Sequence, residues 1–230
     1  MSLQNIIDLD RQLLLWFNGS DSLFIDNLAM TLTNGLTWIP LYVALLYLVI
    51  KNNSDIRQIL FIIAGAGLCV LLAGTLNDEL VKPGIARFRP TRDPIIAHLI
   101  DVVDGYRGGR YGFFSSHAAN TFSIAMFFSL LVKSRTLSIM LILWSLVNCW
   151  TRMYLGVHFP GDILCGLLWG GFVGTAVYFL YKYFSKQMIL SNNFISEKYT
   201  LTGYSRSDID IVVCVLGFLY LFALVKACFA

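Results

Sequence analysis

The sequence predicts an all-α fold: a polytopic membrane bundle of about six transmembrane helices, with an amphipathic surface helix at the N-terminus. Two observations support this prediction. The chain of 230 residues is 57% hydrophobic, and its mean hydropathy of +0.68 is too high for an ordinary soluble domain. Its apolar residues also gather in runs of about 20, the length that crosses the hydrocarbon core of a bilayer. We expect a single integral-membrane domain over residues 1–230.

Residues 1–17 predict a helix that lies on the membrane surface. Asp8, Asp10 and Arg11 interrupt the apolar residues, so this segment is neither a signal peptide nor a transmembrane span. The apolar side chains recur at helical spacing: Leu3, Ile6, Ile7, Leu13, Leu14 and Phe17. The alternative interpretation is a helix that packs against the end of the bundle.

Six apolar runs separated by polar turns are the predicted spans. They cover residues of about 28–50, 57–79, 115–132, 136–152, 160–181 and 209–229. Ser115 or Ser116 can cap the third span, and Pro160 suits the first turn of the fifth. Glycines in the second and fifth spans allow close helix packing: Gly65, Gly67, Gly74, Gly166, Gly170, Gly171 and Gly174.

Composition also limits the function. A net charge of +3 is small for this length, which argues against binding to nucleic acid. The cysteines lie in apolar runs without metal-ligand spacing, and we interpret all five as core residues: Cys69, Cys149, Cys165, Cys214 and Cys228. The sequence does not indicate the oligomeric state.

A cluster of ionisable groups occupies residues 151–162, between two apolar runs. Charges beside hydrocarbon are costly unless they pair or line a functional site. His158 and Asp162 are four residues apart, a spacing that on a helix would let Asp162 hold one imidazole nitrogen and leave the other free for nucleophilic attack. Arg152, expected in the same element, adds a planar cation suited to phosphate oxygens. This segment therefore predicts a histidine that faces a phosphate.

Two further segments complete a recognisable pattern. Residues 82–90 end one apolar run with three cations, and residues 114–117 begin the next run. Together the three segments resemble the signature of the type 2 phosphatidate phosphatase superfamily: K-x6-R-P, then P-S-G-H, then S-R-x5-H-x3-D. The matching residues are Lys82, Arg89, Pro90, Ser115, His117, Arg152, His158 and Asp162. Phe114, Ser116 and Thr151 depart from the pattern, which has Pro, Gly and Ser there.

The resemblance implies a metal-independent membrane phosphatase whose signature region covers residues 82–162. It implies that His158 attacks phosphorus and becomes a phosphohistidine, that Asp162 orients His158, and that His117 protonates the leaving oxygen and then activates water. It implies a phosphate site made of Lys82, Arg89, Arg152, Ser115 and Ser116. No metal or other cofactor is expected.

The expected partner is a lipid phosphate or pyrophosphate that enters from the membrane. Undecaprenyl pyrophosphate and lipid A phosphate are favoured, and phosphatidylglycerol phosphate is possible. The glycine-rich, basic residues 105–112 suit either a lid over a large headgroup or a solvated surface loop. Two other functions stay open: a phosphotransferase that passes phosphate to a lipid alcohol, and a non-catalytic lipid transporter.

The order of the spans places the three motif segments on one side of the membrane. Because the motif cations are held by function, we count only cations outside the motifs, and the other side receives eight: Lys51, Arg57, Lys133, Arg135, Lys182, Lys186, Lys198 and Arg206. By the positive-inside rule, the site then faces away from the cytoplasm, on the periplasmic face of the cell inner membrane. Both termini are expected on that same side. No catalytic role is assigned to the residues outside the signature: Arg87, Arg92, His98, Arg107 and Arg110.

Overall fold

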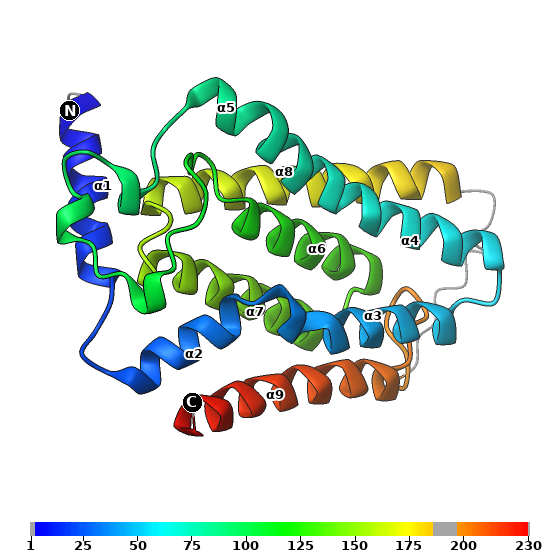
Figure 1. Ribbon diagram of the computed structural model, residues 1–230. Helices are drawn as coiled ribbons and strands as arrows, with labels where there is room; N and C mark the ends of the chain where they lie inside the picture. Colours follow the sequence, from blue (N-terminus) through cyan, green and yellow to red (C-terminus); the bar gives the residue numbers. More distant parts are fainter. Residues whose placement is uncertain (1–2, 186–196, 230) are drawn as a thin grey trace.

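The computed structural model describes residues 3–185 and 197–229, which form the predicted helical bundle (Figure 1). Within these residues, extended pairing is limited to two isolated β-bridges, Phe88 with Tyr111 and Tyr199 with Ser205. Lys186, one of the cations assigned to the side opposite the site, lies outside the described residues. The all-α prediction is confirmed.

Helix α1 (Leu3–Phe17) lies across one end of the bundle, nearly at right angles to the long helices (Figure 1). Leu14 is fully buried and packs with Ile96, Ile100 and Phe159. Apolar residues on the rest of the helix stay accessible, including Trp16 at 79% exposure. Helix α1 therefore packs against the end of the bundle, as the alternative interpretation expected, and it keeps an exposed apolar surface; a position on the membrane surface stays a prediction.

The first predicted span is present but bent. It is divided into α2 (Leu23–Thr33), a 3-10 turn at Gly35–Trp38 and α3 (Ile39–Asn52). The Asn34 side chain accepts a hydrogen bond of 3.0 Å from the Leu36 N–H, and this local bond competes with the helical one. The Trp38 indole donates to the Leu32 carbonyl at 2.9 Å, which satisfies an acceptor freed at the break. Both segments pack along α9 (Arg206–Phe229).

The second span is longer than predicted. Helix α4 (Ile56–Val70) continues through two π-helical segments, Leu71–Thr75 and Asn77–Val81, into α5 (Lys82–Ile85). This stretch of 30 residues is about 45 Å long at 1.5 Å per residue. The hydrocarbon core is only about 30 Å thick. The stretch is therefore longer than the hydrocarbon core is thick, and its last turns carry Asp78 and Lys82.

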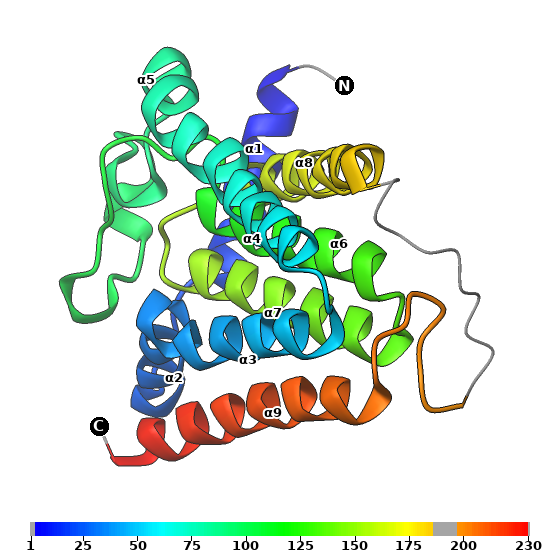
Figure 2. The same ribbon diagram turned by 90° about the vertical axis from the view of Figure 1, so that its right-hand side faces the viewer.

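Helix α6 (Ser116–Val132) occupies the centre of the bundle, against α4, α7 (Arg135–Tyr154) and α8 (Pro160–Ser185) (Figure 2). The predicted close packing of the glycines occurs along α8. A Cβ atom at Gly170 would lie 2.4 Å from the Ala119 carbonyl oxygen, and one at Gly174 would lie 2.3 Å from the Ser123 carbonyl oxygen. These glycines let α8 touch the backbone of α6.

Five helices of the described residues are long and apolar enough to cross a membrane: Gly35–Asn52, Ile56–Ile85, Arg135–Tyr154, Pro160–Ser185 and Arg206–Phe229. Helix α6 is apolar but has 17 residues, and it corresponds to the remaining predicted span. The chain is a multi-pass membrane protein. Both termini lie at the end of the bundle that carries α1 and the long loop (Figure 1).

The cysteines follow the core prediction only in part. Cys69 and Cys149 are buried and Cys165 is half-buried, whereas Cys214 and Cys228 are exposed on α9. The prediction of a core position is wrong for these last two. Because a membrane bundle is apolar on its outside as well, an apolar run does not separate core positions from lipid-facing ones.

Candidate active site

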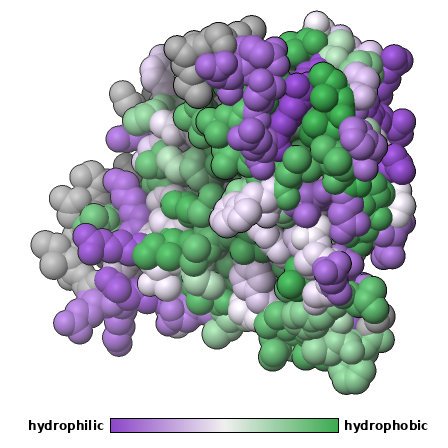
Figure 3. Space-filling model, turned by 90° about the vertical axis from the view of Figure 1, so that its left-hand side faces the viewer, coloured by the Kyte–Doolittle hydropathy of each residue, from purple (hydrophilic) through white to green (hydrophobic). Residues whose placement is uncertain are grey.

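The three motif segments converge at the end of the bundle that α1 covers. This end carries hydrophilic and hydrophobic patches side by side (Figure 3). Two helix starts, two helix ends and the loops between them supply the predicted site residues. In chain order these are Lys82, Arg89, Ser115, Ser116, His117, Arg152, His158 and Asp162.

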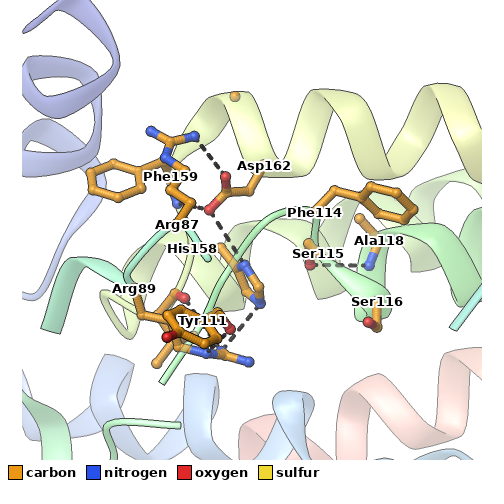
Figure 4. Close-up of polar contacts among 12 residues, drawn as sticks. Arg87, Arg89, Tyr111, Phe114, Ser115, Ser116, Ala118, His158, Phe159 and Asp162 are labelled. Carbon is orange, nitrogen blue, oxygen red and sulfur yellow. Dashed lines mark hydrogen bonds and ion pairs between the residues drawn. The ribbon is translucent and has the colours of Figure 1, made fainter. Parts of the chain in front are cut away.

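His158 is the most enclosed member of the cluster, at 1% exposure. Its ring lies between Asp162 and Arg89 (Figure 4). The Nε2 atom is 3.2 Å from Nη1 of Arg89, and the Nδ1 atom is 3.6 Å from Oδ2 of Asp162. Because a guanidinium group can only donate, Nε2 must accept, and the ring proton therefore lies on Nδ1, towards Asp162. This tautomer leaves the Nε2 lone pair directed at the cations.

The expected shared helical face of His158 and Asp162 is wrong. His158 lies in the turn before α8, which begins at Pro160, and Arg152 belongs to α7. Asp162 folds back so that its Oδ2 accepts a hydrogen bond of 3.1 Å from the Phe159 N–H. This is the reciprocal contact of a helix N-terminal cap. The cap, and not an i, i+4 helical pair, brings the carboxylate to the imidazole.

Asp162 is fully buried, and Arg87 compensates its charge. The Arg87 Nη1 atom donates to Oδ1 of Asp162 at 2.7 Å, while Nη2 donates to Asp10 of α1 at 2.6 Å. The guanidinium also lies over the ring of Phe159, 4.2 Å from its centroid. Neither Arg87 nor Asp10 is among the site residues that the sequence predicts. Arg87 stands two residues before the signature residue Arg89, and this position could have indicated a role in the site. No feature of the sequence near Asp10 indicates such a role.

Ser116 joins the start of α6 to the end of the α4–α5 span. Its hydroxyl accepts from Lys82 Nζ at 2.9 Å and from Asn77 Nδ2 at 2.8 Å, and it donates to Asp78 at 2.7 Å. Asp78 also pairs with Lys82. Ser115 caps α6 by accepting from the Ala118 N–H at 3.4 Å. The hydroxyl of Ser116, at the glycine position of the signature, therefore fixes Lys82 beside the helix start.

Arg89 and Arg152 are buried at 8% and 2% exposure. Arg152 donates to the hydroxyls of Thr33 and Tyr106, the latter at 3.0 Å. Among the described residues, neither arginine has a carboxylate within 4 Å. Burial, followed by the charge of Arg152, lowers the pKa of Arg89 to about 10, so it stays charged at neutral pH. Buried cations without a counter-ion are costly, which indicates a site built for an anion.

The electrostatics also affect His158. Burial first, and then the charges of Arg89 and Arg152, lower the pKa of His158 below its ordinary value of 6.5. The imidazole is therefore neutral at pH 7, the form that can act as a nucleophile. His117, in the first turn of α6, is half-buried and within electrostatic reach of the same cations.

Residues 105–112 reach the site through a tyrosine and the backbone. Tyr106 contacts Arg152, and the Tyr111 carbonyl accepts from Arg89 Nε at 3.1 Å. The side chains that suggested a basic lid, Arg107 and Arg110, are exposed. The other cationic or imidazole residues outside the signature, Arg92 and His98, are exposed as well.

The described part of the chain contains no group of three or more His, Cys, Asp and Glu side chains placed to hold a metal ion. The polar groups that converge here are instead cations, hydroxyls and imidazoles. Such a donor set suits a phosphate group.

Comparisons with known proteins agree with this arrangement. Residues 55–186 match the family model of the PAP2 superfamily, the type 2 phosphatidate phosphatases. The lipid A 4'-phosphatase of Bacteroides thetaiotaomicron is 40% identical over 174 residues, which cover 75% of this chain and 77% of the relative. The lipid A 4'-phosphatase of Porphyromonas gingivalis is 33% identical over 183 residues, 79% and 76% of the two chains. No solved structure matches. The chain therefore belongs to the PAP2 superfamily and is a membrane phosphatase, a phosphoric ester hydrolase.

Proposed function

We propose that this phosphatase removes the phosphate at the 4' position of lipid A through a phosphohistidine on His158. The observation that carries the mechanism is the tautomer of His158: its Nε2 atom faces Arg89, a buried cation that has no carboxylate within 4 Å among the described residues. The substrate rests on the two relatives, both lipid A 4'-phosphatases that match about three quarters of this chain. Undecaprenyl pyrophosphate and phosphatidylglycerol phosphate become the competing substrates to test.

In the first step, Nε2 of His158 attacks phosphorus, a P–N bond forms and the P–O bond to the lipid breaks. His117, which carries a second ring proton once the phosphate dianion is bound beside it, gives that proton to the leaving oxygen. Asp162 keeps the ring proton on Nδ1 and stabilises the imidazolium that forms. In the second step, His117 takes a proton from water, the hydroxide attacks phosphorus, and the P–N bond breaks to release phosphate.

The buried cations would stabilise the charge that develops on the phosphoryl oxygens. Arg89 and Arg152 are held by neutral groups, so their charge is available to the substrate. Lys82 and the N-terminal turn of α6, from Ser115 on, complete the cradle, because N–H groups at a helix start attract anions.

An apolar pocket supports a lipid as the substrate. It has a volume of about 180 Å³ and lies between α3, α4 and α6, with Tyr42, Ile62, Ile124 and Phe128 in its lining. Ile124 and Phe128 follow His117 by 7 and 11 residues, so all three share one face of α6. An acyl chain in this pocket would leave its headgroup at the catalytic end of the same helix.

We place the active site on the periplasmic face of the inner membrane. With the phosphate-binding cations left out of the count, the end of the bundle opposite the site still carries Lys51, Arg57, Lys133, Arg135 and Lys182 in short connections, and cations in such connections favour the cytoplasmic side.

Phosphate release from purified protein tests the proposal. The wild type, His158→Ala and the control His98→Ala are each given lipid A, undecaprenyl pyrophosphate, phosphatidylglycerol phosphate and phosphatidate. The proposal predicts the highest kcat/KM for lipid A, loss of release in His158→Ala, and normal release in His98→Ala. Preference for another lipid would contradict the substrate, and activity in His158→Ala would contradict the mechanism. A dephosphorylated lipid without free phosphate would identify a phosphotransferase.

A further inference from the structure

We propose that Asp10, on the surface helix α1, is a positioning residue that acts through Arg87 on the carboxylate of Asp162. The inference rests on the proposed roles of His158 and Asp162, and it assigns to α1 a part in the chemistry. Asp10 lies outside the signature region, more than 70 residues before the first signature residue Lys82.

The three side chains form a continuous chain of charges. Asp10 Oδ2 accepts from Arg87 Nη2 at 2.6 Å, and Arg87 Nη1 donates to Asp162 Oδ1 at 2.7 Å. The exposed fraction of the side chain is 12% for Asp10, 28% for Arg87 and 0% for Asp162. The two carboxylates hold the Nη1 and Nη2 atoms of Arg87, and the ring of Phe159 covers the face of its guanidinium group. The orientation of the guanidinium plane is therefore fixed as well.

Asp10 has a second contact that ties α1 to the same helix start. Its Oδ1 accepts from the Gly161 N–H at 2.7 Å. Pro160 has no N–H, so Gly161 supplies the first free donor of α8. A Cβ atom at residue 161 would lie 2.9 Å from a carboxylate oxygen of Asp10, which makes glycine the residue that permits this approach. Asp10 therefore holds both the backbone of α8 and the cation that binds Asp162.

Sharing Arg87 between two carboxylates has a chemical consequence. Arg87 binds the Oδ1 atom of Asp162, whereas Oδ2 is the atom that faces His158. With Asp10 in place, one end of the guanidinium is occupied and its geometry is fixed, so Arg87 orients Asp162 without displacing Oδ2. Without Asp10, Arg87 is free to take both oxygens of Asp162 in a bidentate pair, the geometry that guanidinium and carboxylate favour. Asp162 would then orient His158 less well.

The test compares kcat and KM for phosphate release from lipid A by the full-length protein. Asp10→Asn keeps an oxygen for the Gly161 N–H and removes the charge that binds Arg87. We expect kcat to fall about tenfold, the scale on which hydrogen-bonded partners of active-site groups act, with KM unchanged. Asp8→Asn is the matched control: it removes the same charge from the same helix, at a side chain that is 50% exposed. It should keep the wild-type kcat and KM.

A double-mutant cycle separates positioning from general stability. Arg87→Gln should lower kcat, and Asp10→Asn should add nothing in that background. If Asp10→Asn does not fold, Asp10→Glu replaces it, because this variant keeps the charge. We expect Asp10→Glu to lower kcat less than Asp10→Asn does, and to have no effect on kcat in the Arg87→Gln background. Wild-type kcat in folded Asp10→Asn, or an equal loss with and without Arg87, would overturn the inference. If the wild type itself released no phosphate from any lipid, the proposed function would fall, and this inference with it.

Discussion

The cations of the site differ in whether a carboxylate accompanies them. Lys82 pairs with Asp78, and Arg87 pairs with Asp10 and Asp162. Arg89 and Arg152 are held only by carbonyl, hydroxyl and imidazole groups among the described residues. A cation that is already neutralised holds structure, whereas a buried one with neutral partners keeps its charge for a ligand. By this criterion we expect Arg89 and Arg152 to be the principal phosphate-binding groups.

The pH dependence of the reaction tests this arrangement at His158. Burial and the charges of Arg89 and Arg152 lower the pKa of His158, so the nucleophile should lose activity only below its ordinary value of 6.5. Arg89→Gln removes one of these positive neighbours, and the acidic limb of kcat/KM should move up towards pH 6.5 as the pKa of His158 rises. Profiles of the two proteins, measured from pH 4 to pH 8, would contradict this account if Arg89→Gln moved the limb down or left it in place.

Tyr106 is expected to contribute through its hydroxyl. Tyr106→Phe removes a hydrogen bond to a charged group, which is worth about 1.5 kcal/mol or more and thus about tenfold or more in kcat/KM. Tyr111→Phe is the matched control, because Tyr111 contacts Arg89 through its backbone carbonyl. Steady-state kinetics of both variants check the prediction. Equal values for Tyr106→Phe and the wild type would show that Arg152 does not need this partner.

The residues of the site differ in how far the sequence could predict them. His117, Arg152 and His158 carry ionisable groups beside apolar runs. Placing such groups near hydrocarbon costs free energy, so their presence in the sequence indicates a functional site. The proximity of His158 to Asp162 was predicted for the wrong reason, since a cap contact replaces the helical face. Asp10 could not be predicted, because its contact with Arg87 joins residues 77 positions apart. A contact this distant in the chain leaves no periodic pattern in the sequence.

At the scale of elements, the contact between α6 and α8 sets the position of the catalytic groups. The first turn of α8 carries Asp162 and the first turn of α6 carries His117, so the distance between these helices determines the geometry of the site. The Ser115 N–H donates to the Asp162 carbonyl at 3.1 Å, which links the two helix starts directly.

Gly170→Ala should separate these helices. Its added methyl group meets the Ala119 carbonyl oxygen at 2.4 Å, and such overpacking costs about 1–3 kcal/mol. Gly217→Ala is the control, because nothing lies within 4 Å of a Cβ atom at this position of α9. There the replacement of a helical glycine should stabilise by about 0.5–1 kcal/mol. Unfolding in detergent measures both; a Gly170→Ala variant as stable as Gly217→Ala would contradict the close contact.

The bend of the first span shows what an apolar run leaves undetermined. The sequence predicts an apolar span over residues 28–50 and its length, but it does not predict that Asn34 and Gly35 break the helix. The Asn34 side chain forms its own local hydrogen bond, and Trp38 satisfies the freed carbonyl from inside the bundle. The second of these depends on tertiary packing, which hydropathy does not describe.

At the scale of the molecule, the site, α1 and the end of α9 lie at one end of the bundle, and the α3–α4 and α6–α7 connections, which carry Lys51, Arg57, Lys133 and Arg135, lie at the other (Figure 1). The polytopic all-α fold was predictable because length and hydropathy limit what a bilayer accepts. Helix α1 combines an apolar surface with the Asp10 contact, so the membrane-facing element and the active site form one assembly.

Single-cysteine labelling tests the orientation. In a background whose five native cysteines are alanine, His98→Cys lies on the exposed loop beside the site and Arg135→Cys lies exposed at the opposite end. A maleimide that passes the outer but not the inner membrane should label His98→Cys in intact cells and Arg135→Cys only after lysis. The reverse pattern would place the site in the cytoplasm.

The most direct test of the central claim is the trapping of the phosphoenzyme. Purified protein is mixed with lipid A that carries a radioactive 4'-phosphate and is quenched within milliseconds in base, where phosphohistidine survives. We predict label on His158 in the wild type and in His98→Ala, at a level that rises before phosphate release becomes steady, and no label in His158→Ala. Steady phosphate release without labelled protein, or label on another residue, would contradict the account.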